Sequence, residues 1–135
     1  MLIALSDIAI LVRDYDEAKA FYVDILGFEL VEDLDQGDGR RWVTVTPPGT
    51  RNIRIVFSRV VTDSQLAGVG KQGAGRVIFF VTTDNFDADY ALFRSRGVKF
   101  VGEARKEAFG KVAIFEDLYG NRWDLIEPKT SYVKG

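Results

Sequence analysis

Short apolar stretches separated by turn residues run along the chain and predict β-strands. The first of them, residues 8–12, is rich in β-branched side chains. After it, apolar residues recur at helical spacing as far as Gly27, which predicts a helix that begins at Asp14 with Glu17 in the capping-box position. Turns that contain glycine or proline then separate three more predicted strands, at residues 28–32, 41–46 and 53–58.

The same order of elements recurs in the second half of the chain. A strand at residues 77–81 is followed by a helix that Asp84 and Asp87 open and Gly97 ends. Three predicted strands follow this helix, at residues 98–102, 111–115 and 122–127.

This repetition predicts a single domain, residues 1–135, that consists of two repeats at residues 1–60 and 76–128. A glycine-rich connector at residues 62–75 joins them. In each repeat the helix covers one face of the strands, and the free faces, placed opposite each other, enclose a cup. The predicted fold class is therefore α+β, with two tandem β-α-β-β-β modules forming a curved mixed sheet around a cup.

Glycines in the connector spell the pattern GxGxxG at Gly68, Gly70 and Gly73. A dinucleotide site of this type needs a strand before the glycines and a helix after them. Here a strand follows instead, at residues 77–81, so the pattern is typical of a flexible connector.

The amino-acid composition excludes several kinds of catalytic site and of binding partner. The chain contains 18 Lys and Arg against 20 Asp and Glu, and it has no Cys and no His. Disulfides, thiolate nucleophiles, imidazole bases and Ser-His-Asp triads are therefore excluded. The basic residues are dispersed, which predicts no nucleic-acid and no membrane partner. The apolar N-terminus lacks a basic leading segment and a cleavage site, so we expect a cytoplasmic protein.

Three segments resemble the vicinal oxygen chelate superfamily, which includes glyoxalase I, extradiol dioxygenases, fosfomycin-resistance transferases and bleomycin-resistance proteins. They are DIAILVRDYDEAKAFYVDILGF at residues 7–28, RWVTVTPPG at 41–49 and FEDLYGNRWDLIEP at 115–128. The likeness covers nearly the whole chain and implies the same duplicated fold. It also implies a homodimer, whose cup is completed within one chain or between two.

In the metalloenzymes of this superfamily, the first and fourth strands of each half carry one metal ligand each. Matched residue by residue, these positions are occupied here by Asp7, Arg54, Arg76 and Asp124. Strand alternation independently places the four side chains on the faces turned away from the helices, so we expect them to converge on one cavity. By the same alternation Trp42, Thr44 and Phe80 line the cup.

Two arginines are unsuited to a metal site, because a guanidinium offers no lone pair. No cofactor and no metal ligand are predicted. A divalent ion held by Asp7, Asp124 and a further carboxylate such as Glu116 or Asp117 stays open as an alternative. A neighbouring arginine is expected to lower the pKa of Asp7 and Asp124, which makes both poor general bases near pH 7, and no catalytic residue is predicted.

Three functions remain. The first is a glyoxalase/bleomycin-resistance-like protein that binds a small, anionic or zwitterionic organic molecule, with Arg54 and Arg76 as the anion contacts. The second is a metal-dependent lyase, isomerase or dioxygenase of the same superfamily. The third is a non-catalytic dimeric scaffold in which the four charged residues form internal salt bridges. Whether the protein is an enzyme stays open.

Overall fold

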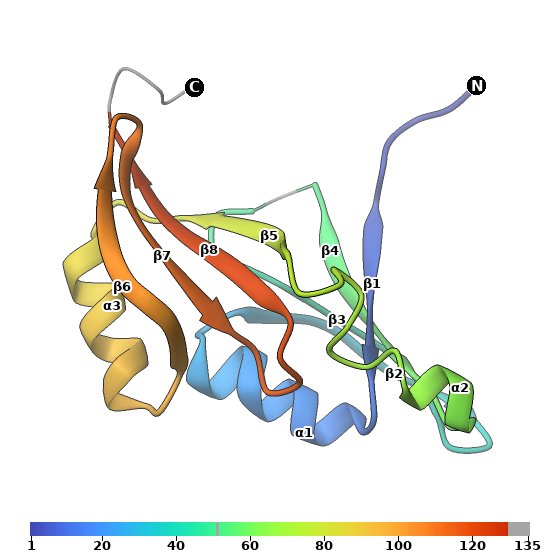
Figure 1. Cartoon of the computed structure of the whole chain (residues 1–135). Helices are drawn as coiled ribbons and strands as arrows, with labels where there is room; N and C mark the ends of the chain where they lie inside the picture. Colours follow the sequence, from blue (N-terminus) through green and yellow to red (C-terminus); the bar gives the residue numbers. More distant parts are fainter. Residues whose placement is uncertain (51, 130–135) are drawn as a thin grey trace. The chain divides into compact units, whose positions relative to one another are not determined.

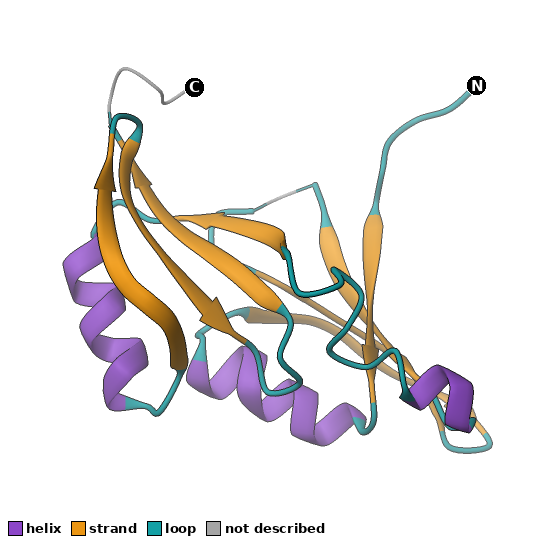
Figure 2. Ribbon diagram, viewed as in Figure 1, coloured by secondary structure: helices purple, strands orange, loops and turns teal. Residues whose placement is uncertain are grey.

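The computed structural model describes residues 1–50 and 52–129, and the chain divides into two compact units, Met1–Val69 and Gly70–Gly135. Each unit contains one four-stranded mixed sheet and a helix between its first two strands (Figures 1 and 2). The prediction of two tandem β-α-β-β-β modules is confirmed.

In the first unit, the strand order is β1-β4-β3-β2, with β1 and β4 parallel and the other neighbours antiparallel. The elements are β1 (Asp7–Val12), α1 (Tyr15–Lys19), the π-helical continuation η1 (Ala20–Ile25), β2 (Glu29–Gly37), β3 (Arg40–Thr46), β4 (Arg54–Arg59) and α2 (Asp63–Leu66).

The helix of the first unit begins where the sequence predicts. The carboxylate of Asp14 accepts a hydrogen bond from the backbone N–H of Glu17 at 2.8 Å, which caps the first turn. The helix ends before Gly27, whose φ of +80° is accessible to glycine at little cost. Its second half is a π-helix, which the sequence pattern does not predict. Tyr22, fully buried, packs its ring 5.7 Å from that of Phe57 and so fixes the helix to β4.

The second unit repeats the topology as β5-β8-β7-β6, and α3 lies along one face of its sheet (Figure 1). Asn85 caps α3 by accepting a hydrogen bond from the N–H of Ala88 at 3.2 Å, so the predicted opening at Asp84 is one residue early. The elements are β5 (Val77–Thr82), α3 (Phe86–Ser95), β6 (Lys99–Glu107), β7 (Gly110–Glu116) and β8 (Arg122–Pro128).

The side-chain alternation in the strands follows the sequence prediction. In β3, Val43 and Val45 are fully buried, and in β8, Trp123 and Leu125 are 2% exposed. These residues form the helix-facing cores, because successive strand side chains point to opposite faces. None of the helices in the described residues has the length and hydropathy needed to span a membrane.

Candidate ligand-binding site

Asp7 and Arg54 lie side by side on the open face of the first sheet. The parallel pairing of β1 with β4 sets the two residues opposite each other, and the Arg54 Nη2 to Asp7 Oδ1 distance is 3.3 Å. The side chain of Asp7 is 15% exposed and that of Arg54 is 36% exposed. The first unit therefore holds an acid–arginine ion pair of the kind that the scaffold alternative requires.

A third charged residue, Glu32 on β2, joins this pair and was not predicted. Its Oε1 atom accepts hydrogen bonds from Arg54 Nη1 at 3.3 Å, from the indole N–H of Trp42 at 3.1 Å and from the hydroxyl of Thr44 at 3.1 Å. Thr44, which is fully buried, and Trp42 thus share the open face with Arg54, as strand alternation predicts.

The three charged residues of this network, Asp7, Glu32 and Arg54, sum to one negative charge. Both hydrogen-bonding ends of the Arg54 guanidinium point at carboxylates. Asp7 Oδ2 is buried and accepts no hydrogen bond from any described residue. The guanidinium of Arg54 therefore organises Asp7 and Glu32, and each of its two Nη atoms already donates to a carboxylate.

In the second unit, Arg76 and Asp124 are arranged differently. Arg76 is exposed and precedes β5, while Asp124 lies opposite Phe80 in the β5/β8 ladder. Phe80 is 65% exposed. Asp124 makes no ion pair with any residue in the described part of the chain. The convergence of Asp7, Arg54, Arg76 and Asp124 on one cavity stays a prediction.

The direction in which the pKa of Asp124 is shifted also differs from the expectation. Burial raises the pKa of the Asp124 carboxyl, and Arg105 opposes this only in part. Arg105 instead contacts Glu107, at 2.9 Å between Nε and Oε1. The prediction that a neighbouring arginine lowers the pKa of Asp124 is wrong, because desolvation dominates where no cation contacts the carboxylate.

In the first sheet, β3 and β4 do not pair along part of their length. β3 and β4 pair only at Thr44 with Val56 and at Val45 with Ile55, although both strands continue well beyond these residues. In the unpaired part of β3, the backbone N–H of Arg41 donates to the hydroxyl of Tyr15 at 3.2 Å. A side chain from α1 therefore satisfies a backbone donor where β4 has moved away.

A cavity of about 690 Å³ lies where β3 and β4 diverge. It is contained within the first unit, and its lining reaches from the open face of the sheet to the first turn of α1. Its apolar and aromatic lining residues are Ala9, Tyr15, Trp42, Val56, Phe57 and Val61. The hydrogen bond to Glu32 fixes the indole ring of Trp42 at this cavity, so the ring is an ordered wall.

The charged residues of the lining are three arginines and one aspartate: Asp38, Arg40, Arg41 and Arg59. The Tyr15 ring stacks with two of the guanidiniums, with its centroid 5.2 Å from Cζ of Arg41 and 5.8 Å from Cζ of Arg59. Nη2 of Arg59 also donates to the carbonyl of Gly39 at 3.4 Å. The cavity thus combines an aromatic wall with a cationic rim.

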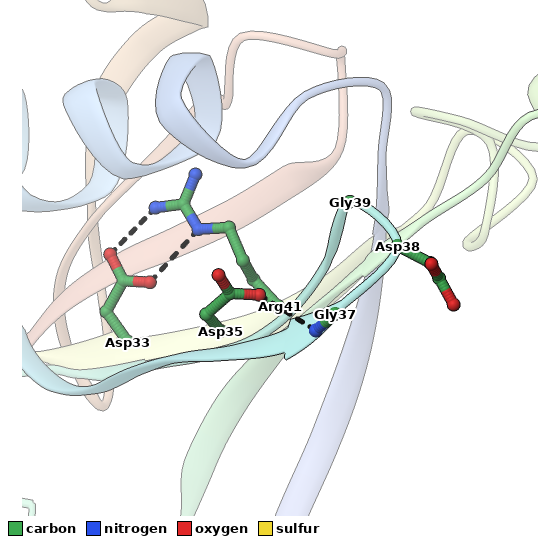
Figure 3. Close-up of a pocket in the computed structure, with 6 residues that line it drawn as sticks. All are labelled: Asp33, Asp35, Gly37, Asp38, Gly39 and Arg41. Carbon is green, nitrogen blue, oxygen red and sulfur yellow. Dashed lines mark hydrogen bonds and ion pairs between the residues drawn. The ribbon is translucent and has the colours of Figure 1, made fainter.

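The charge of Arg41 is balanced away from this cavity. Its Nε and Nη2 atoms contact the two carboxylate oxygens of Asp33 at 3.1 and 2.7 Å (Figure 3), and Nη1 contacts Asp16 at 2.9 Å. These contacts and that of Lys19 lower the pKa of Asp33 to about 2, and Asp33 raises the pKa of Arg41. This cluster fastens α1 to β2 and β3, beside a smaller hollow of about 470 Å³ that includes Asp35.

The carboxylates that were considered as additional metal ligands have other partners. Within residues 1–50 and 52–129, no three acidic side chains lie close enough together to hold a metal ion. Glu116, considered as an extra ligand, contacts Lys99 and Arg122, each at 3.4 Å. The Asp117 carboxylate accepts hydrogen bonds from the N–H groups of Tyr119 and Asn121 and from the Asn121 amide, so it closes the turn before β8.

Comparisons with known proteins agree with this fold. A family model described as the Glyoxalase/Bleomycin resistance protein/Dioxygenase superfamily matches residues 4–125. A protein of Shewanella frigidimarina is 45% identical over 121 residues, which are 89% of this chain and 90% of that protein. The crystal structure of UcmS2 is 32% identical, with a TM-score of 0.81 over 94% of this chain and 99% of that chain. TnmS3, an antibiotic binding protein from a Streptomyces species, is 29% identical, with a TM-score of 0.76 over 95% and 98%. The predicted glyoxalase-like fold is confirmed.

Proposed function

The chain belongs to the glyoxalase/bleomycin resistance protein/dioxygenase superfamily, and from this premise we propose that it binds a small, anionic or zwitterionic organic molecule in the cavity between β3 and β4. The observation that carries this proposal is the cavity itself. Its volume of about 690 Å³ falls in the range of small-molecule sites, and its lining combines apolar and aromatic side chains with an equal number of polar and charged ones.

The indole ring of Trp42 determines which shape of ligand this site favours. An indole held in one orientation offers a flat apolar surface at little entropic cost, which favours a ligand with a planar body. Val56 and Phe57 supply further apolar contact from β4. The likeness to TnmS3, which is an antibiotic binding protein, also supports small-molecule binding.

The proposal is tested by titrating the protein with naphthylacetate, a planar organic anion, and following the indole N–H signals by NMR. We expect the Trp42 signal to move while that of Trp123, which is 2% exposed, stays in place. Trp42→Ala should weaken binding roughly tenfold or more, because the stacking surface is lost. Phe109→Ala, which removes a half-exposed ring from the second unit, is the matched control and should leave binding unchanged. Equal affinity of the Trp42→Ala variant and the parent protein would contradict the site.

A dimeric scaffold is the second candidate, and the ion pairs of Arg54 with Asp7 and Glu32 favour it. In that function Arg54→Met should lower the free energy of unfolding by about 2 kcal/mol, because two half-buried carboxylates lose their counter-charge. Thermal unfolding and sedimentation measure stability and dimer formation. If a dimer forms but neither naphthylacetate nor related planar compounds bind, the scaffold replaces the binding function.

A further inference from the structure

The cavity between β3 and β4 has a charged rim that no predicted site residue supplies. We propose that Arg40 and Arg59, and not Arg54, form the anion-recognising end of this cavity, so that the ligand is a planar aromatic anion whose ring lies against Trp42. This inference rests on the proposed function and adds the residues that select the charge of the ligand.

The charges of the lining support this assignment. Of the three arginines at the cavity, Arg41 is held by Asp33 and Asp16. Arg40 and Arg59 make no ion pair within residues 1–50 and 52–129. Asp38 is the acidic residue of the lining, so an anionic ligand brings this end of the cavity to neutrality.

Arg59 is held in position for this role. Its guanidinium lies over the Tyr15 ring, with Cζ 5.8 Å from the centroid, and one of its N–H groups reaches the carbonyl of Gly39. The remaining donors are available to a carboxylate or another planar oxyanion, which a guanidinium can bind through two parallel hydrogen bonds.

Arg54 is a poor candidate for the same task. It contacts Asp7 and Glu32, each at 3.3 Å, and this network carries a net negative charge. An anion approaching Arg54 meets two carboxylates, whereas an anion approaching Arg40 and Arg59 meets one, Asp38. Because Trp42 is anchored to Glu32 and also lines the cavity, the ring of the ligand lies between the two charged regions.

Three probes with the same ring test the inference: naphthylacetate is an anion, naphthylacetamide is neutral and naphthylethylamine is a cation. We expect the anion to bind about tenfold more tightly than the amide, by calorimetry at low salt. The cation should bind most weakly. The double variant Arg40→Gln, Arg59→Gln should bind anion and amide equally while keeping the affinity of the parent protein for the amide, which shows that the cavity is intact.

Two single variants distinguish the effect of Arg40 and Arg59 from that of other arginines in the chain. Arg94→Gln removes an arginine that stacks on Tyr90 in the second unit, and it should retain the preference for the anion. Arg54→Gln should retain it as well. The inference would be overturned if Arg54→Gln no longer preferred the anion to the amide, or if the double variant still did. Either result would leave the cavity as a binding site. If none of the three probes moves the Trp42 signal, the proposed function itself fails.

Discussion

The two units share one topology but differ in how their central strands pair. In the second unit, β7 and β8 pair from Gly110 with Pro128 to Glu116 with Arg122, along the full length of both strands. In the first unit, the corresponding strands β3 and β4 pair at two positions and then diverge. The same order of elements therefore yields a continuously paired sheet, here called the closed sheet, in the second unit. In the first unit it yields a sheet with a cavity between β3 and β4.

Side-chain size at equivalent positions explains the difference. Gly110 occupies the place that Arg40 occupies in the first repeat, and Val112 the place of Trp42. A Cβ atom at position 110 would collide with the carbonyl oxygen of Glu127, so close pairing there requires glycine. An arginine at position 40 could not be accommodated if β3 ran as close to β4 at this end as β7 runs to β8. The comparison indicates that replacing one glycine by a bulky residue at the end of a strand can open a cavity in this fold.

The most disruptive test of the comparison is Gly110→Ala. The added methyl group would collide with the backbone of β8, and the φ of +148° at this position is unfavourable for a side chain. We expect a loss of about 3 kcal/mol in the free energy of unfolding, measured by urea denaturation. Gly49→Ala is a milder control, because a Cβ there, although its φ of +89° also strains it, meets no atom within 4 Å. If the two variants were equally stable, steric contact would not account for the closed sheet.

The ion cluster that fastens α1 to the open sheet is expected to have an intermediate effect. Asp33→Asn should cost about 1–2 kcal/mol at pH 7, after allowance for solvent screening. The pKa of Asp33 is about 2 against an ordinary value of 3.8, so this stabilisation is complete above pH 4 and lost as the pH falls towards 2. Unfolding measured as a function of pH should therefore show the parent and variant converging near pH 2. Asp24→Asn, on an exposed residue of the same helix, should leave the profile unchanged.

The smallest effect is expected at Asp124 in the closed sheet. Because burial raises its pKa, the fold disfavours the ionised carboxyl, and this group contributes most stability at low pH and progressively less as the pH rises through its folded pKa. Asp124→Asn should therefore raise stability at pH 7, by less than about 1 kcal/mol, and remove that part of the pH dependence. A variant less stable than the parent protein at pH 7 would mean that the carboxylate has a favourable partner.

The sequence predicts the elements of the fold well because local signals agree with packing. The cap at Asp14, the helix stop at Gly27 and the burial of Val43 and Val45 all follow from residue type and spacing. The pairing of Asp7 with Arg54 also follows, since strand alternation places both on the open face.

The rest of the site depends on pairing register, which residue pattern does not encode. A bulge between Leu30 and Glu32 shifts β2 against β3, and the predicted strand ended at Glu32, so its carboxylate was not assigned to the open face. The divergence of β3 from β4 was also not predicted. The signal for it in the sequence is the difference between Arg40 and Gly110 at equivalent positions of the two repeats, because close pairing at position 110 requires glycine.

The opening in the first sheet also has a consequence for local dynamics. The amide of Arg41 is bonded to a phenolic hydroxyl of Tyr15, while the equivalent stretch of β7 lies within a continuous ladder. A bond to one side chain breaks without separating two strands, so amide hydrogens at this end of β3 should exchange with solvent deuterium faster than those of β7. A molecule that fills the gap would slow that exchange and so couple occupancy to the rigidity of the strand pair.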